Sequence, residues 1–419
     1  MLDIKFIRQN PEVVKQAAKA KNVSVDVDKL LALDERRRQL QGEVDQTNSF
    51  RNAIAKASEG GKPTPDQIAQ GKKYKEQAAE LERELKAVET ELNELLLMVP
   101  QIPDESVPVG TTDADNKEVR TWGEVPSFDF EPKDYMTLME SLDLADVERG
   151  AKVSGFRGYF LKNEAALLSQ ALWMFALSQL IKKGFTPIIA PAIANEMAFR
   201  GTGWLPQGKD EVYKVGDDAY LIGTSEVSMM AYHSGEILLE KDLPKKYVAF
   251  SPCFRSEAGS YGKDTKGILR VHEFYKIEQV ILGKADHEDS VAWHEEITKN
   301  SEELVQALNL PYRVVVNCMG DLGLGQVKKY DIETWLPSQQ RYRETHSASY
   351  FHDFQTRRLN IKYRDNKGQT HFAYSLNNTA IATPRILAAI VENYQTNTGT
   401  VKIPEVLKPW MLGKEEISR

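Results

Sequence analysis

Residues 254–279 read FRSEAGSYGKDTKGILRVHEFYKIEQ, and this stretch decides the fold. A long glycine-containing loop separates two apolar, β-branched runs at 247–254 and 268–282, which predicts two adjacent antiparallel strands. Because side chains alternate along a strand, one face of the second strand is expected to carry Arg270, His272, Phe274, Lys276 and Glu278. Burying that many unpaired charges costs several kcal/mol each, so the row predicts a polar binding surface.

An exposed edge strand is the alternative explanation for this row of charges. The ring of Phe274 in the middle of the row argues against it, because an aromatic side chain gains most from burial. A guanidinium, a ring and a carboxylate on one face suit a nucleotide, since they can bind phosphate, base and an amino group. The chain has no GxxxxGK[ST] motif and no GxGxxG motif that opens a helix, which excludes the P-loop and dinucleotide-binding folds.

A second phosphate-binding candidate lies near the end of the chain. Apolar residues at helical spacing follow Thr383 and Pro384, and these two are expected to be the cap and the first turn of a helix. Arg385 then lies at a helix N-terminus, where a cation is disfavoured unless an anion binds there too. We therefore expect Arg385 to bind a ligand phosphate; an ordinary surface arginine is the alternative.

The first hundred residues differ in character from the rest of the chain. Two charged segments, 30–58 and 64–99, flank a turn at 59–63. The second has apolar residues at alternating spacings of four and three: Tyr74, Ala78, Leu81, Leu85, Val88, Leu92, Leu95 and Val99. This spacing predicts an antiparallel coiled coil. Its tip is rich in lysine, which indicates a phosphate contact; a solvated arm or a dimerisation arm is the alternative.

Composition narrows the class of protein. The 419 residues include 54 Lys and Arg against 61 Asp and Glu, a net charge of −7, so the surface as a whole does not attract nucleic acid. Two cysteines, Cys253 and Cys318, form no CxxC pair, which excludes a disulfide framework and a cysteine-based zinc site and indicates a reducing cytoplasm. The charged start and the short aliphatic runs predict neither export nor a membrane span. A proline-rich linker at 100–108 suggests domains at 1–103 and 104–419.

Several segments together resemble the seryl-tRNA synthetases, a family of class II aminoacyl-tRNA synthetases. They are the stretch 254–279, GTGWLP at 201–206, TSE at 224–226, ETHSAS at 344–349, DFQTRR at 353–358 and the closing helix with Arg385. The resemblance implies an α+β catalytic domain, an antiparallel mixed sheet flanked by helices, with an N-terminal antiparallel coiled-coil arm. It also implies a cytoplasmic homodimer with residues 184–191 at its interface.

The resemblance further implies a role for individual residues. Arg255 and Arg385 would be the catalytic residues. ATP would be bound by Arg255, Ser256, Glu257, Arg270, Val271, Phe274, Glu344, Thr345, His346, Ser347 and Arg385. Serine would be bound by Thr224, Ser225, Glu226, Arg255, Glu278 and Thr379. Mg²⁺ would be held by Glu344 and Ser347, and no zinc is expected.

In this arrangement Phe274 would stack on adenine opposite Arg385, and Glu257 would meet the adenine amino group. His272 is expected to be structural rather than a general base. The chain departs from common bacterial members at His346, which is bulkier than the usual small residue and is expected to crowd the nucleotide, and at Asn378. Thr379 replaces the usual serine but keeps the hydroxyl.

The implied reaction is ATP-dependent attachment of L-serine to serine tRNA through a seryl-adenylate, with selenocysteine tRNA as an additional acceptor. The arm would contact the long extra arm of the tRNA. Two alternatives remain: a paralogue that activates an amino acid for another acceptor, and a catalytically silent tRNA-binding paralogue.

Overall fold

The computed structural model describes residues 1–419 except 58–61, 260, 261, 263 and 265. Residues 59–61 of the predicted turn at 59–63 and part of the glycine-containing loop therefore lie outside the described residues. The chain divides into two compact units, one of Leu2–Pro100 and one of Met1 with Gln101–Arg419. Each unit is described by itself below.

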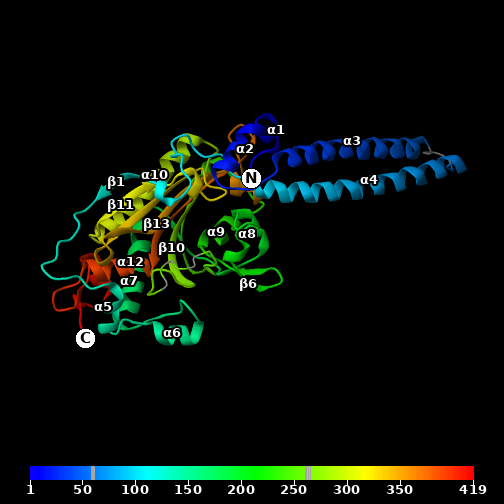
Figure 1. Cartoon of the computed structure of the whole chain (residues 1–419). Coiled ribbons are helices and arrows are strands. Elements are labelled where there is room, and N and C mark those ends of the chain that lie inside the picture. The colour runs from blue at the N-terminus through cyan, green and yellow to red at the C-terminus, as the bar shows by residue number, and fades with distance from the viewer. Residues whose placement is uncertain (58–61, 260–261, 263, 265) are drawn as a thin grey trace. The chain divides into compact units, whose positions relative to one another are not determined.

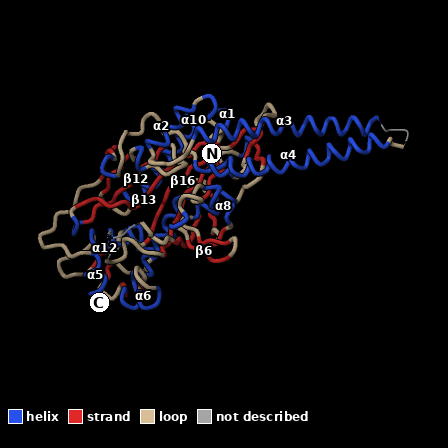
Figure 2. The backbone as a smooth tube through the Cα atoms, turned by 45° about the vertical axis from the view of Figure 1, so that its right-hand side comes forward, coloured by secondary structure: helices blue, strands red, loops and turns tan. Residues whose placement is uncertain are grey.

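The N-terminal unit contains the predicted helical hairpin. Two short helices, α1 (Ile4–Gln9) and α2 (Pro11–Ala20), precede the long helices α3 (Val27–Ala57) and α4 (Pro65–Met98), which run side by side (Figures 1 and 2). A capping box starts α4, because the Thr64 hydroxyl accepts from the Gln67 backbone and the Gln67 amide oxygen accepts from the Thr64 backbone. The predicted antiparallel coiled coil is confirmed.

Apolar side chains from both long helices form the seam of this hairpin. Leu40 and Val44 of α3 cluster with Leu85 of α4. Farther along, the rings of Phe50 and Tyr74 stack with their centroids 5.6 Å apart. The hydrophobic contacts run along most of both helices, as the spacing of four and three requires.

An eight-stranded sheet forms the core of the second unit. Its strand order is β1-β11-β12-β13-β16-β10-β9-β4. The strands in that order are Lys117–Trp122, Tyr312–Val316, Lys328–Leu336, Arg341–His352, Tyr374–Thr383, Glu273–Gly283, Lys245–Phe254 and Thr186–Ile189. Every neighbouring pair is antiparallel except β4 and β9, which run parallel. This is the expected antiparallel mixed sheet.

Helices α7 (Asn163–Lys182) and α10 (His287–Ala307) cover one face of the sheet. The Trp173 ring of α7 lies 5.1 Å from the Tyr275 ring of β10, and the Gln279 amide of β10 donates to the Ile297 carbonyl of α10 over 3.0 Å. Within the described residues, α7 is the one helix long and apolar enough to cross a membrane by length and composition. Its residues Leu168 and Leu172 are buried in the core, as in the core helix of a globular domain.

Shorter elements complete this unit. The helices are α5 (Tyr135–Ser141), α6 (Val147–Ser154), α8 (Glu196–Thr202), α9 (Ser225–Ala231), α11 (Phe354–Arg358) and α12 (Arg385–Asn393). The small strands are β2 (Ala145–Asp146), β3 (Phe160–Leu161), β5 (Ile193–Ala194), β6 (Tyr213–Gly216), β7 (Ala219–Leu221), β8 (Ile237–Leu239), β14 (Lys362–Arg364), β15 (Thr370–Phe372), β17 (Val401–Lys402) and β18 (Glu416–Ile417).

Two predicted boundaries are wrong. The strand expected from residue 268 begins only at Glu273, because residues 268–272 are irregular backbone. Thr383 does not cap α12: it ends β16, where its hydroxyl donates to the Tyr275 carbonyl over 3.1 Å and accepts from the Trp173 indole over 3.2 Å. Pro384 takes the N-cap position, so Arg385 still opens the helix.

Candidate active site

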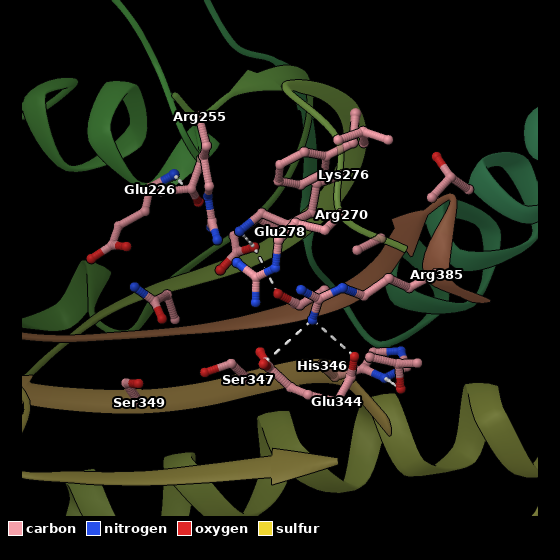
Figure 3. Close-up of a pocket in the computed structure, with 18 of the residues that line it drawn as sticks. Glu226, Arg255, Arg270, Lys276, Glu278, Glu344, His346, Ser347, Ser349 and Arg385 are labelled. Atoms are coloured by element: carbon pink, nitrogen blue, oxygen red, sulfur yellow. Dashed lines mark hydrogen bonds and ion pairs between the residues drawn. The ribbon is translucent and has the colours of Figure 1, made fainter. Parts of the chain in front are cut away.

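A cavity of about 340 Å³ lies on the sheet face opposite α7 and α10. Phe274, Lys276 and Glu278 of β10 all line it, which confirms the predicted alternation for these three (Figure 3). The remaining walls come from strands β12, β13 and β16, from the single loop that joins β9 to β10, and from the first turns of α9 and α12. Trp204 and Gln326 complete the lining.

An irregularity between β10 and β16 brings two of the predicted serine-binding residues together. Glu278 pairs with Thr379, whereas Ile277 pairs with Ile381, so one extra residue sits in β16 at this point. Bulges of this kind redirect side chains next to binding sites. Here the Thr379 hydroxyl donates to Glu278 Oε2 over 3.4 Å.

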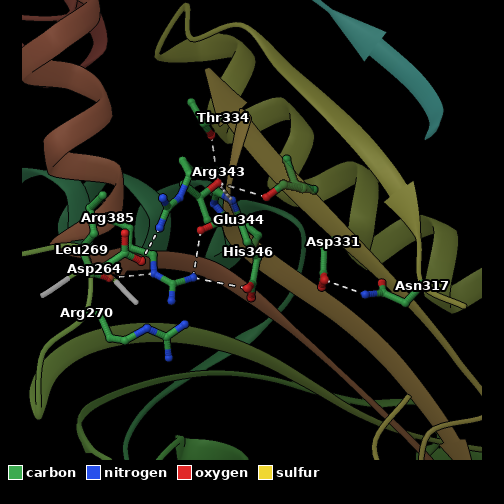
Figure 4. Close-up of polar contacts among 12 residues, drawn as sticks. Asp264, Leu269, Arg270, Asn317, Asp331, Thr334, Arg343, Glu344, His346 and Arg385 are labelled. Carbon is green, nitrogen blue, oxygen red and sulfur yellow. Dashed lines mark hydrogen bonds and ion pairs between the residues drawn. The ribbon is translucent and has the colours of Figure 1, made fainter. Parts of the chain in front are cut away.

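The two arginines predicted from distant stretches both line the cavity. The Arg255 guanidinium carbon lies 5.3 Å from the Phe274 ring centroid and 5.7 Å from the Trp204 ring centroid. Arg385 donates from Nε to the Leu269 carbonyl over 3.0 Å and from Nη1 to the Glu344 carbonyl over 2.9 Å (Figure 4). Backbone acceptors on two segments therefore fix the position of Arg385 at the cavity wall.

A third arginine joins them. Arg270 forms an ion pair with Glu257, whose backbone adopts a left-handed conformation with φ of 56°. Only a few per cent of non-glycine residues adopt such a conformation, and it is concentrated at functional sites. Three guanidinium groups in one cavity match the charge of a triphosphate.

Two further carboxyl groups line the cavity close to Arg255, and we call this part the carboxyl end (Figure 3). Glu278 is 2% exposed and pairs with the Lys276 ammonium over 2.6 Å, whereas Glu226 is half-buried. Burial, and then the charge of Glu278, raises the pKa of Glu226 to about 7. Burial also raises the pKa of Glu278, although Lys276 opposes it.

Thr224 holds the backbone of Glu226 in position. It is the N-cap of α9, and its hydroxyl accepts from the Glu226 backbone over 3.3 Å. Both side chains line the cavity.

Glu344 and Ser347 line the cavity as the predicted magnesium ligands. Desolvation works against ionisation of Glu344, but the charges of Arg385 and Lys329 outweigh it and hold its pKa below the ordinary value. An ionised carboxylate and a hydroxyl are hard oxygen donors and fit a Mg²⁺ ion that phosphates also hold. Within the described residues, no group of three or more His, Cys, Asp or Glu side chains is arranged to hold a metal ion.

Most of the predicted site residues meet in this cavity, but two do not line it. Ser225 is buried in the first turn of α9, and the Ser256 hydroxyl donates to the Asp210 carbonyl. His272 lies outside it as well, with Nδ1 2.9 Å from the Arg255 carbonyl, and lines a smaller cavity of about 180 Å³. Its contact with the Arg255 backbone is a structural one.

His346, which is predicted to crowd the nucleotide, lies in the cavity wall. Only 1% of the residue is exposed, and its Nδ1 lies 2.8 Å from the Thr345 hydroxyl. Burial lowers the pKa of His346 to about 4, so the ring is neutral at physiological pH. The imidazole fills space inside the wall rather than the space for a ligand.

Sequence reasoning gave no site role to several cavity residues: Trp204, Leu269, Lys276, Gln326, Lys329, Ser349, Phe351, Asn377, Ala382, Thr383 and Pro384. The alternation along β10 placed Lys276 on the correct face, and GTGWLP contains Trp204. Gln326 and Lys329 lie outside every motif, so only the tertiary fold brings them here.

An antiparallel sheet that carries a cavity with arginines from the loop after one strand and from the start of a C-terminal helix defines a class II aminoacyl-tRNA synthetase. Residues 211–394 match the family model "tRNA synthetase class II core domain (G, H, P, S and T)", and residues 1–103 match "Seryl-tRNA synthetase N-terminal domain". The chain belongs to the seryl-tRNA synthetase family.

Full-length relatives support this assignment. The chain is 46% identical over 422 residues to a serine–tRNA ligase of Deinococcus radiodurans, covering 100% of this chain and 99% of the relative. A solved seryl-tRNA synthetase of Pyrococcus horikoshii complexed with ATP has a TM-score of 0.91 at 42% identity, and that comparison covers 100% and 99% of the two chains. A cytoplasmic serine–tRNA ligase of Naegleria fowleri in complex with AMP has a TM-score of 0.87 at 36% identity, again covering 100% and 99%.

Proposed function

We propose that this cavity activates L-serine with ATP and transfers the serine to its tRNA. As a member of the seryl-tRNA synthetase family, the chain is a class II serine–tRNA ligase. The observation that carries the proposal is the meeting of three arginines, an aromatic ring and the carboxyl groups of Glu226 and Glu278 around one space.

The carboxyl end of the cavity binds serine in this proposal. Glu226 and Glu278 accept hydrogen bonds from the amino group of the substrate, and Thr379 bonds its hydroxyl. A site built to bond a hydroxyl rejects an analogue without one strongly, because the buried polar groups are then left unpaired. The contact of 3.4 Å between Thr379 and Glu278 supports joint recognition of the amino group and the side chain.

The part of the cavity lined by Phe274, Arg270 and Arg385 binds ATP. Phe274 offers a ring for adenine, Arg255 holds the α-phosphate and the serine carboxylate, and Arg270 and Arg385 hold the outer phosphates. The ATP and AMP complexes of the two solved relatives support a nucleotide here. In the structure Arg270 pairs with Glu257, so the nucleotide exchanges this ion pair for contacts to adenine and phosphate.

Catalysis follows from position and charge. The serine carboxylate attacks the α-phosphorus and pyrophosphate leaves, while Arg255 and Arg385 stabilise the negative charge of the transition state. Glu344 and Ser347 would hold Mg²⁺, which supplies charge neutralisation to the phosphates. The tRNA 3′-terminal hydroxyl then attacks the seryl carbonyl carbon, the bond to the α-phosphate breaks and AMP leaves, so no protein nucleophile is required.

In this proposal the tRNA and a second copy of the chain bind to surfaces outside the cavity. The helical arm, within domain 1–103, contacts the long extra arm of serine tRNA, and selenocysteine tRNA is a second acceptor. Domain 104–419 forms a homodimer through the open edge strand β4: Ile189 is 83% exposed there, and Met174 and Ile181 of α7 are exposed too. Two free cysteines and the cytoplasmic relative support a cytoplasmic location.

Two assays test the proposal. Serine-dependent exchange of pyrophosphate into ATP is expected, which a catalytically silent paralogue would not support. Charging of serine tRNA is also expected, which a paralogue with another acceptor would not perform. Exchange with threonine or alanine in preference to serine would overturn the substrate assignment.

A further inference from the structure

Gln355 lies behind the cavity wall and is linked to the proposed serine site. It belongs to α11 and is 1% exposed, and it does not line the cavity. Its amide nitrogen donates to Glu226 Oε1 over 2.6 Å. Its amide oxygen accepts from the Ser375 hydroxyl of β16 over 2.8 Å. A continuous hydrogen-bonded chain therefore runs from β16 through α11 to α9.

The two partners of the Gln355 amide hold it in one orientation. A glutamine side chain can turn over and exchange its oxygen and nitrogen, but an ionised carboxylate only accepts, so the NH₂ group must face Glu226. The Ser375 hydroxyl, which can donate or accept, donates to the amide oxygen that remains. A carboxylate needs a donor, so both ends of the amide are satisfied in one orientation only.

Glu226 and Glu278 have different partners. Glu278 is paired with the Lys276 cation over 2.6 Å. Glu226 receives its hydrogen bond from a neutral amide instead, and the charged groups that face it are Glu278, Lys276 and Arg255. A neutral donor orients a carboxylate without neutralising its charge, and the charge stays available for a bound ammonium group.

The protonation of Glu226 depends on the same contact. Burial and Glu278 raise its pKa to about 7, and the hydrogen bond from Gln355 opposes that rise because it favours the ionised form. Loss of the donor therefore raises the pKa further and protonates more of Glu226 at neutral pH.

We propose that Gln355 is a positioning residue for serine recognition, which holds Glu226 as an oriented, ionised acceptor for the amino group of the substrate. This inference rests on the proposed role of Glu226 in serine binding. Gln355 touches neither substrate, and Ser375 acts one step farther back by fixing the amide.

Gln355→Met in the full-length protein tests the inference, because methionine fills a similar volume and donates no hydrogen bond. Pyrophosphate exchange is measured against serine and against ATP from pH about 6 to about 9. The KM for serine is expected to rise about tenfold or more, as for loss of a hydrogen bond to a charged group, with the KM for ATP unchanged. The pH below which the KM for serine climbs is expected to move upward. An unchanged KM for serine with an unchanged pH profile would overturn the inference.

Gln395→Met is the matched control. Gln395 is also buried, and its amide nitrogen donates to the Lys133 carbonyl over 3.0 Å and the Glu392 carbonyl over 2.9 Å, but it does not line the cavity or contact Glu226. The KM of the Gln395→Met variant for serine is expected to equal that of the unmodified chain. If this control raises the KM for serine as much as Gln355→Met does, the effect is general destabilisation and the inference is wrong.

Two further variants keep the result decisive. Ser375→Ala leaves Gln355 in place but removes the hydroxyl that holds its amide oxygen, so a smaller rise in the KM for serine is expected. If Gln355→Met does not fold, Ser375→Ala becomes the deciding variant, and an unchanged KM for serine in it overturns the inference. Glu226→Gln separates the two proposals. If it leaves serine binding unchanged, the role of Glu226 fails; if it weakens binding while Gln355→Met does not, only the role of Gln355 fails. In the Glu226→Gln background, Gln355→Met is expected to add little further loss.

Discussion

Thr379 and Glu278 face each other across β16 and β10, and the threonine hydroxyl donates to the glutamate carboxylate over 3.4 Å. The extra residue in β16 creates this pairing, so the backbone itself brings a hydroxyl and a carboxylate to the same point of the cavity. In the proposed serine complex, this contact joins the residue that bonds the substrate hydroxyl to a residue that bonds the substrate ammonium.

Thr379→Val tests the hydroxyl contact. Valine has nearly the same shape but cannot donate or accept, so a serine hydroxyl would be buried without this partner. The kcat/KM for serine in pyrophosphate exchange is expected to fall about tenfold or more, while that for alanine changes little. The control is Thr398→Val, whose hydroxyl is exposed and bonds only Thr396 and Thr400. Equal losses for serine and alanine would contradict specific recognition.

Arg255→Ala is expected to abolish adenylate formation. The variant removes a cation that contacts the α-phosphate and the serine carboxylate in the proposed complex. Pyrophosphate exchange measures the loss, and thermal unfolding with size-exclusion chromatography checks that the protein stays folded. Arg313→Ala is the control, because Arg313 also lies over a ring, that of Tyr342, but outside the cavity. Near-normal exchange in Arg255→Ala would remove Arg255 from its role.

Sequence alone predicted what depends on local pattern. Alternation placed Phe274, Lys276 and Glu278 on one face, and spacing of four and three predicted the paired helices. It failed at Thr383 because the tertiary contact with Trp173 competes with helix capping. Gln355 was not singled out, since its role depends on Glu226 and Ser375, which lie 129 and 20 residues away. Long-range hydrogen bonds of this kind leave no periodic signal.

Serine binding is expected to weaken as the pH falls through about 7. Burial and the nearby Glu278 raise the pKa of Glu226 to about that value, and protonation removes an acceptor and a negative charge that face the substrate amino group. The KM for serine should therefore rise at lower pH, while the KM for ATP follows a different profile. In Glu226→Gln this step should disappear and leave a uniformly high KM. A KM for serine that stays flat between pH about 6 and about 8 would show that Glu226 does not titrate there.

Removal of the outer arm is expected to separate the two half-reactions. Val44 and Leu85 belong to the same cluster in the seam, so they lie close together. A short glycine linker can therefore replace the segment from Val44 to Leu85 without disturbing the parts of α3 and α4 that remain. The shortened protein should keep serine-dependent exchange, because no cavity residue lies in the deleted segment, but charge serine tRNA far more slowly. Binding of tRNA to the intact protein should weaken steeply with salt, since basic residues near the tip meet phosphates, and the shortened protein should lose much of that dependence. If both proteins charge tRNA equally, the arm is not a tRNA-binding element, and the basic residues near its tip are an ordinary solvated surface.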